Sequence, residues 1–213
     1  MTRLSLLLVL LGLLLIGAGC PKRDAAGMST IEPPAPPAKA VKPAKPAQAE
    51  PAQKEGSTVG FKVTSPAFKD GDRMPVKYTE DGANFSPELA WAGPPAQTAG
   101  FALIMNDPDA PSGDWVHWVV YGLPATLTGL PEGIPTSAQP AQLKGGQQGR
   151  NSYGKLGYHG PGCPPGKVHH YVFKVYALDA AIALPPGATK AQLLKAMEGH
   201  ILGQAQLVGT YSR

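Results

Sequence analysis

Two apolar runs joined by a proline-containing loop constrain most strongly what this chain can fold into. Residues 101–105 read Phe-Ala-Leu-Ile-Met, the loop begins Asp-Pro-Asp-Ala-Pro, and residues 115–121 read Trp-Val-His-Trp-Val-Val-Tyr. The first run is short and suits a buried strand better than a helix. Each proline favours extended or turn geometry in the residue before it, so the loop should be stiff. The segment therefore predicts two successive strands, with Asp107 and His117 facing each other across a loop mouth.

Strict alternation would give the second of these strands two distinct faces. One face would carry Trp115, His117, Val119 and Tyr121, and the other would carry Val116, Trp118 and Val120. We interpret both tryptophans as core residues rather than ligand-stacking groups, because large aromatic side chains dominate protein cores.

The remainder of the domain has the pattern of many short strands and one helix. Strands are predicted at residues 59–63, 74–78, 89–91, 171–178 and 206–211. Residues 189–198 carry an apolar stripe with helical spacing, which Ala188 or Thr189 could begin. Residues 130–160 form a long connection rich in Gly, Gln, Pro and Ser, and such connections are usually functional or mobile. We therefore expect a mainly β fold, an antiparallel β-sandwich with a C-terminal helix.

The N-terminal segment has the pattern of a bacterial lipoprotein signal peptide, which we assign to residues 1–19. Arg3 precedes a leucine-rich run, and Gly17-Ala-Gly precedes Cys20. The apolar run is short for a membrane span. Small residues ending at Cys20 resemble a lipobox, in which the cysteine is acylated, although Gly17 stands where leucine is usual. The prediction is an exported, lipid-anchored protein of the bacterial cell envelope; a plain signal peptide with a free Cys20 is the alternative.

Residues 20–57 form a tether rich in Pro, Ala and Lys, and the folded domain is assigned to residues 58–213. The tether has almost no large apolar side chain, so it cannot offset the entropy of ordering and should be disordered and extended. The domain holds twelve Lys or Arg and eleven Asp or Glu, a net charge of +1. It shows no basic stripe with interleaved aromatics, which argues against nucleic acid as a partner.

The candidate site combines the two predicted strands with a third. Alternation places His169 and Tyr171 on one face and His170 on the other, so His169 is the expected companion of His117. Two imidazoles and a hydroxyl beside a glycine-rich loop would make a small donor-rich pocket, which can bind an anion without strong positive charge. Because an anion favours the protonated imidazole, binding should weaken as the pH rises.

Structural readings of the same residues stay open. Asp107 before a proline is often only a turn acid, and His117 can be a satisfied core histidine. A zinc site from Asp107, His117 and His169 lacks tight ligand spacing, so we expect no metal and no cofactor. With Cys20 acylated, Cys163 has no cysteine to pair with, and we interpret it as a buried or loop thiol.

Five motifs in order resemble the phosphatidylethanolamine-binding protein family, in particular its bacterial Raf kinase inhibitor-like branch. They are Asn84-Phe-Ser-Pro-Glu-Leu-Ala-Trp91, Asp107-Pro-Asp-Ala-Pro111, Trp115-Val-His-Trp-Val-Val-Tyr121, Gly157-Tyr-His-Gly-Pro-Gly-Cys-Pro-Pro-Gly166 and His169-His-Tyr-Val-Phe173. The resemblance covers essentially the whole domain and implies a β-sandwich with a small pocket for phosphate-like groups. His170 departs from the pattern, since relatives often have arginine there.

Carried over from this resemblance, the pocket residues would be Asp107, His117, His169 and Tyr171, with Pro111, Gly162 and Pro165 at its rim. The expected partner is a small anion or a phosphorylated head group. We favour a binding module over an enzyme, because no activated nucleophile or metal cluster is evident. A hydrolase that uses His117 and His169 with Asp107 for acid–base work is the alternative. A loop-mediated protease or kinase inhibitor is a third possibility.

Overall fold

The computed structural model describes residues 60–213. The signal peptide assigned to residues 1–19, the acylation of Cys20 and the tether assigned to residues 20–57 lie outside the described residues. They remain predictions.

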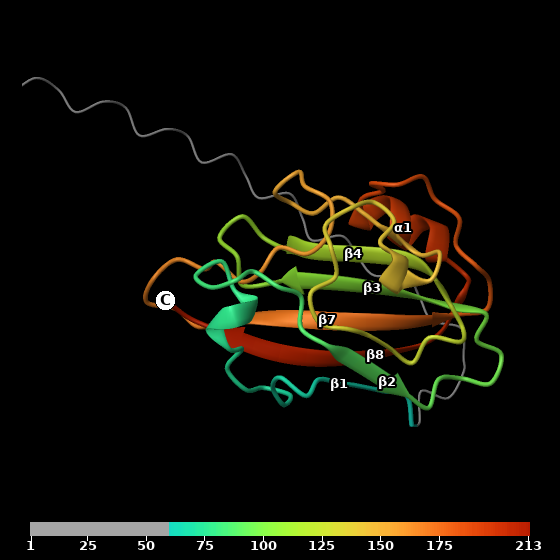
Figure 1. Cartoon of the computed structure of the whole chain (residues 1–213), viewed down its shortest axis with the longest axis horizontal. Helices are drawn as coiled ribbons and strands as arrows, with labels where there is room; N and C mark the ends of the chain where they lie inside the picture. Colours follow the sequence, from blue (N-terminus) through green and yellow to red (C-terminus); the bar gives the residue numbers. More distant parts are fainter. Residues whose placement is uncertain (1–59) are drawn as a thin grey trace, which may run out of the picture. The chain divides into compact units, whose positions relative to one another are not determined.

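The described domain contains two antiparallel sheets (Figure 1). The smaller sheet has the order β1 (Lys62–Thr64), β2 (Leu89–Ala92) and β5 (Gly129–Leu130). The larger sheet has the order β6 (Gln147–Gln148), β4 (Trp115–Pro124), β3 (Gly100–Asp107), β7 (His169–Leu178) and β8 (Ile201–Tyr211). Figure 1 shows β4, β3, β7 and β8 side by side, with β2 overlapping β8 in this view and β1 lying below it. The predicted mainly β, antiparallel architecture is confirmed.

The main hydrophobic core fills the space between the two sheets. Trp91 of β2 packs on Phe101 of β3 with ring centroids 5.4 Å apart, and Phe61 lies 6.2 Å from the same ring. Strand β2 alternates between buried and exposed residues, as expected for a sheet with one solvated face. The side of β2 that carries Leu89 and Trp91 therefore closes the sandwich.

The outer face of the larger sheet is covered by α1 (Lys190–Met197) and the segment before it. Leu193, Leu194 and Met197 are buried against Ile104 and Tyr121 of the sheet. Strand β3 is therefore covered on both faces, which explains why its first six residues are all buried. The continuous apolar run at residues 101–105 was the sequence signal of this central position.

A buried ion pair joins α1 to the loop between β3 and β4. Lys190 donates to Asp114 at 2.6 Å, and both side chains are largely buried. The second oxygen of Asp114 accepts from the side-chain amide of Asn106 at 2.5 Å. The loop that carries Pro111 is thus fixed to the helix behind the sheet as well as to β3.

Strand β4 has an extra residue at His117. Met105 pairs with Trp118 and Asn106 pairs with Val116, which leaves His117 without an opposite residue. The strict alternation predicted for this strand is therefore wrong, because the bulge turns His117 to the face that carries Trp118. Its ring lies 5.2 Å from that of Tyr171, whereas Val119 belongs to the core beneath α1. Bulges of this kind often redirect a side chain next to a site.

Two predicted elements differ in the structure. Residues 74–78 form no strand; Val76–Tyr78 is a short 3-10 helix (η1) that follows Pro75. Proline has no amide hydrogen to donate to a sheet ladder, so the run cannot continue as a strand. Strand β8 begins at Ile201, earlier than the predicted residue 206. The sequence pattern missed this part of the strand because it contains Gly203, which nevertheless pairs with Ala177.

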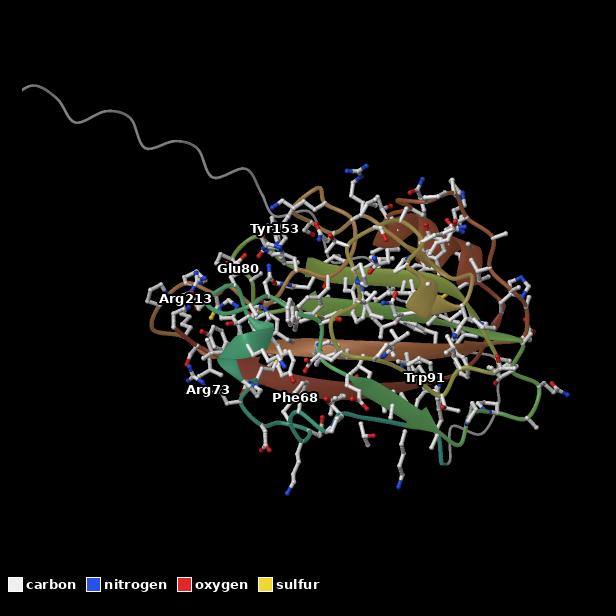
Figure 2. The ribbon with its side chains drawn as sticks, viewed as in Figure 1. Phe68, Arg73, Glu80, Trp91, Tyr153 and Arg213 are labelled. Carbon is white, nitrogen blue, oxygen red and sulfur yellow. The ribbon has the colours of Figure 1, made fainter. Side chains whose placement is uncertain are left out.

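The long connection at residues 130–160 is held by buried polar contacts. It contains the short 3-10 helix η2 (Ala141–Leu143) and strand β6. The side chain of Gln148 accepts from Trp118 Nε1 at 2.7 Å and donates to the carbonyls of Pro135 and Ser137. This connection carries Tyr153 toward one end of the larger sheet (Figure 2), and the ring of His159 lies against that of Tyr153. Within residues 60–213, no helix has the length and apolar character needed to cross a membrane.

The capping box of α1 provides a test of the helix boundary. Gln192 N–H donates to Thr189 Oγ1, and Thr189 N–H donates to Gln192 Oε1 at 2.8 Å. We expect Thr189→Ala to lower the free energy of unfolding in urea by about 1 kcal/mol. Thr64→Ala on exposed β1 serves as the control and should change it by only a few tenths of that amount. Equal losses in the two variants would contradict the capping role.

Candidate functional site

A cavity of about 220 Å³ opens where β3 ends and β7 begins. Its wall is formed by Asp107, Ala110, Pro111, Ser112, Trp115, His117, Tyr153, Gly162, Cys163, Pro164, His169 and Tyr171. Antiparallel pairing brings together the last residue of β3, the first of β4 and the first of β7. Figure 2 shows Tyr153, Glu80 and Arg213 at this end of the domain, with Trp91 toward the other end.

Asp107 and His169 form a buried pair at the base of the cavity. His169 Nδ1 lies 2.8 Å from Asp107 Oδ2, and the two side chains are 3% and 5% exposed. The other oxygen, Oδ1, accepts from the backbone amide of Asp109 at 2.8 Å. Since a carboxylate only accepts, Nδ1 carries the proton and Nε2 is the ring nitrogen left for the cavity.

His117 is held in the same tautomer by a different partner. Its Nδ1 donates to the backbone carbonyl of His159 at 2.7 Å, and His159 N–H donates back to the carbonyl of His117 at 3.1 Å. Burial lowers the pKa of His117 below its ordinary value, although the His159 carbonyl and the Asp107 charge oppose this. The imidazole is therefore neutral at pH 7, and its Nε2 is a hydrogen-bond acceptor at the cavity wall.

Tyr171 brings an unused hydroxyl to the same wall. Its side chain is fully buried, and among the described residues its oxygen has no nitrogen or oxygen partner; the sulfur of Cys163 is its hydrogen-bonding neighbour. Burial raises the pKa of Tyr171, and the nearby Asp107 charge and Cys163 thiol raise it further. A buried hydroxyl without a partner costs about 1–3 kcal/mol. Tyr171 therefore provides the cavity with a hydroxyl that can donate to an oxygen of a ligand.

A polar cluster that was not predicted from the sequence supports the position of His117. Its members are Glu80, Tyr153, His159 and Arg213. Glu80 accepts from His159 Nε2 at 2.6 Å and from Arg213 Nη2 at 3.1 Å. The ring of Tyr153 lies on that of His159, with centroids 3.8 Å apart. Because the carbonyl of His159 orients His117, this cluster fixes the imidazole indirectly.

The loop over the cavity is packed directly against Glu80. A Cβ atom at Gly162 would collide with the Glu80 carboxylate, so a larger residue there would displace Glu80 from its contacts with His159 and Arg213. The Gly162 carbonyl accepts from Arg213 Nη1 at 3.3 Å, and the Gly160 amide donates to Asn84 Oδ1 at 2.7 Å. The Asn84 motif and the glycine-rich motif thus meet in space, which their separation in the sequence did not indicate.

The structure brings most of the predicted site residues to one cavity. Asp107, Pro111, His117, Gly162, His169 and Tyr171 line it together. Pro165 is exposed and outside the lining, where its neighbour Pro164 lies instead. Trp118 is in the core as interpreted, but Trp115 is half-buried and lines the cavity, with its ring edge-on to Tyr153 at 5.3 Å.

His170 lies on the other face, as alternation predicted. It is exposed and pairs with Asp109 at 2.8 Å. No three His, Cys, Asp or Glu side chains in residues 60–213 are arranged to hold a metal ion together.

Comparison with known proteins now identifies the class to which this fold and cavity belong. The family model described as phosphatidylethanolamine-binding protein matches residues 64–212, and the chain belongs to that family.

Individual relatives cover the described domain almost completely. A UPF0098 protein from Methanothermobacter thermautotrophicus is 50% identical over 153 residues, which cover 72% of this chain and 99% of the relative. The crystal structure of Escherichia coli YbcL, described as a member of the mammalian PEBP family, shares 34% identity with a TM-score of 0.68. The match covers 72% of this chain and 99% of that one. A protein of Mycobacterium tuberculosis named "Putative lipoprotein LppC" is 43% identical over 70% of this chain and 71% of its own length.

The lowered pKa of His117 predicts a pH dependence of stability. The unfolded chain protonates this residue near its ordinary pKa of 6.5, whereas the folded protein does so at lower pH. The free energy of unfolding is therefore highest above pH 6.5. It falls as the pH drops from 6.5 to the lower pKa of the folded state, because the unfolded chain then binds a proton that the folded protein does not. In urea unfolding at a series of pH values from about 7 to about 5, the wild type should lose more stability than His117→Asn. Parallel curves for the two proteins would contradict this assignment.

Two of the buried tyrosine hydroxyls, those of Tyr158 and Tyr171, predict opposite mutational effects. Tyr158 donates to the carbonyl of Tyr78 at 2.6 Å, whereas Tyr171 has no nitrogen or oxygen partner and lies beside the weakly accepting sulfur of Cys163. Tyr171→Phe should therefore raise the free energy of unfolding of the ligand-free protein by about 1–3 kcal/mol, and the control Tyr158→Phe should lower it by about 1 kcal/mol. Denaturant unfolding measures both. A loss of stability in Tyr171→Phe would show that its hydroxyl is already paired.

Proposed function

We propose that the domain is a binding module that holds one small anion or phosphorylated head group in this cavity. The observation that carries the proposal is the convergence of three polar groups: Nε2 of His117, Nε2 of His169 and the hydroxyl of Tyr171. The volume of about 220 Å³ is several times the ~30 Å³ occupied by a liquid water molecule, so a phosphate-sized group fits.

Proton uptake by the imidazoles would strengthen anion binding in this cavity. In the neutral tautomers fixed by Asp107 and the His159 carbonyl, both Nε2 atoms accept hydrogen bonds rather than donate them. Protonation converts each into a charged donor, and a charge-assisted hydrogen bond is about twice as strong as a neutral one. Tyr171 supplies a third donor that needs no protonation. The ligand can also bring its own proton, as a monoprotonated phosphate does.

We further infer that the module is tethered to the membrane of the cell envelope. The support is the lipobox-like sequence at Cys20, the proline-rich segment that follows it, and the name of the lipoprotein relative LppC. Proline-rich chains are extended and semi-rigid, so such a tether would hold the cavity away from the membrane surface.

Calorimetry on the full chain in mild detergent tests the binding proposal. Inorganic phosphate, phosphoethanolamine and acetate are titrated near pH 6 and pH 8, and binding should be tighter at the lower pH because a bound anion favours the protonated form of His117. His169→Ala should weaken phosphate binding by about tenfold or more, since hydrogen bonds to charged groups contribute about 1.5–3 kcal/mol. His200→Ala is the matched control, because His200 is partly exposed, pairs with Asp179 and precedes β8 at the far end of the strand. Absence of binding by all three ligands, or equal weakening in both variants, would reject the proposal.

The hydrolase alternative is tested with the same protein variants, by asking whether phosphoethanolamine is hydrolysed. A histidine oriented by a carboxylate, as in the His169–Asp107 pair, is the arrangement of a general base. Phosphoethanolamine incubated with the protein is followed by phosphorus NMR. An unchanged ligand supports the binding module, and release of free phosphate that His169→Ala abolishes supports the hydrolase.

A further inference from the structure

Cys163 places a thiol inside the proposed ligand cavity. It lines the cavity wall although its exposed fraction is only 3%, so the cavity is the route by which a small reagent reaches it. The thiol donates weakly to the carbonyl of Tyr211 at 3.4 Å. Cys163 is the free cysteine of the described domain, and the chain has two cysteines in all, the other being Cys20.

A second observation beside the thiol points to a ligand oxygen at this place. The hydroxyl of Tyr171 is fully buried, has no nitrogen or oxygen partner among the described residues, and belongs to the same cavity wall, with the Cys163 thiol as its hydrogen-bonding neighbour. Thiol sulfur is only a weak hydrogen-bond acceptor, so the reduced cysteine does not satisfy this donor. An oxygen atom bound to the sulfur would lie in the cavity and could accept from Tyr171.

We propose that Cys163 is an oxidative modification site that controls the cavity. A small neutral peroxide enters and oxidises the thiol by two electrons: the S–H and O–O bonds break, one hydroxyl oxygen bonds to sulfur, and the other takes up the thiol proton and leaves as water. The product is a sulfenic acid, R–S–OH, whose oxygen accepts the hydrogen bond from Tyr171. With no second thiol in the described domain to form a disulfide, the sulfenic acid persists until a thiol reductant restores the cysteine.

This modification would switch anion binding off, a consequence that rests on the proposed function. The added oxygen occupies the part of the cavity where an oxygen of the anion would meet Tyr171. Occupancy and oxidation are therefore mutually exclusive, so each should suppress the other.

The test uses the full chain with Cys20→Ser, so that Cys163 is the sole thiol. Hydrogen peroxide is added, the chain is unfolded in urea containing dimedone, and the adduct at Cys163 is quantified by peptide mass spectrometry. Unfolding lets the probe reach the sulfur without entering the cavity. Phosphate at ten times its Kd should slow adduct formation about tenfold, because the rate follows the fraction of open cavities. The oxidised chain should lose phosphate binding and regain it after dithiothreitol.

Two variants separate this mechanism from general oxidative damage. In Cys163→Ser, phosphate affinity should not change on peroxide treatment, whatever its starting value. In Tyr171→Phe, the sulfenic acid loses its hydrogen bond and should pass on to higher oxidation states instead of accumulating. The modification site is overturned if no adduct forms at Cys163, and the control of the cavity is overturned if the oxidised chain binds phosphate with unchanged affinity. An adduct in a chain that binds no anion even when reduced would support the modification site and reject the proposed function.

Discussion

The antiparallel pairing of β3 with β7 is the constraint on which the site depends. Asn106 pairs with Val172, so the end of β3 and the start of β7 reach the same edge of the sheet. Only this register brings a carboxylate at the end of one strand within 2.8 Å of an imidazole at the start of the other. A slip of one residue would turn every side chain of β7 to the opposite face and separate the pair. Both strands lie in the middle of the five-stranded sheet, where neighbours on each side resist such a slip.

The second histidine reaches the cavity through an irregularity rather than through regular pairing. A bulge in β4 turns His117 to the cavity face, and its backbone contacts with His159 keep it there. Because burial disfavours the charged form of this imidazole, the ring is neutral in the folded protein. The site therefore combines one histidine fixed by a carboxylate with another fixed by a carbonyl, and these partners differ in how strongly they support a positive charge on the ring.

Much of the fold and part of the site could be predicted from the sequence. The parts that could not be predicted have physical reasons. Alternation placed His169 and Tyr171 on one face because β7 is regular at its start. The same rule gave His117 the wrong neighbours, since a bulge leaves no mark in the hydrophobic pattern. Glu80, Tyr153 and Arg213 lie in turns or at a strand end, where no periodicity operates, and only the folded chain brings them together. Asn84 was visible as part of a motif, but its contact with the Gly160 amide could not be inferred from spacing.

Arg213 joins the end of the described chain to the rim of the cavity. Its side chain contacts Glu80, Asp81 and the carbonyl of Gly162, and its own carbonyl accepts from the amide of Gly166. Any group attached after Arg213 would consequently emerge beside the cavity mouth. An environment-sensitive fluorophore fused at that point could report occupancy directly, whereas a bulky purification tag there would crowd the entrance that a ligand must use.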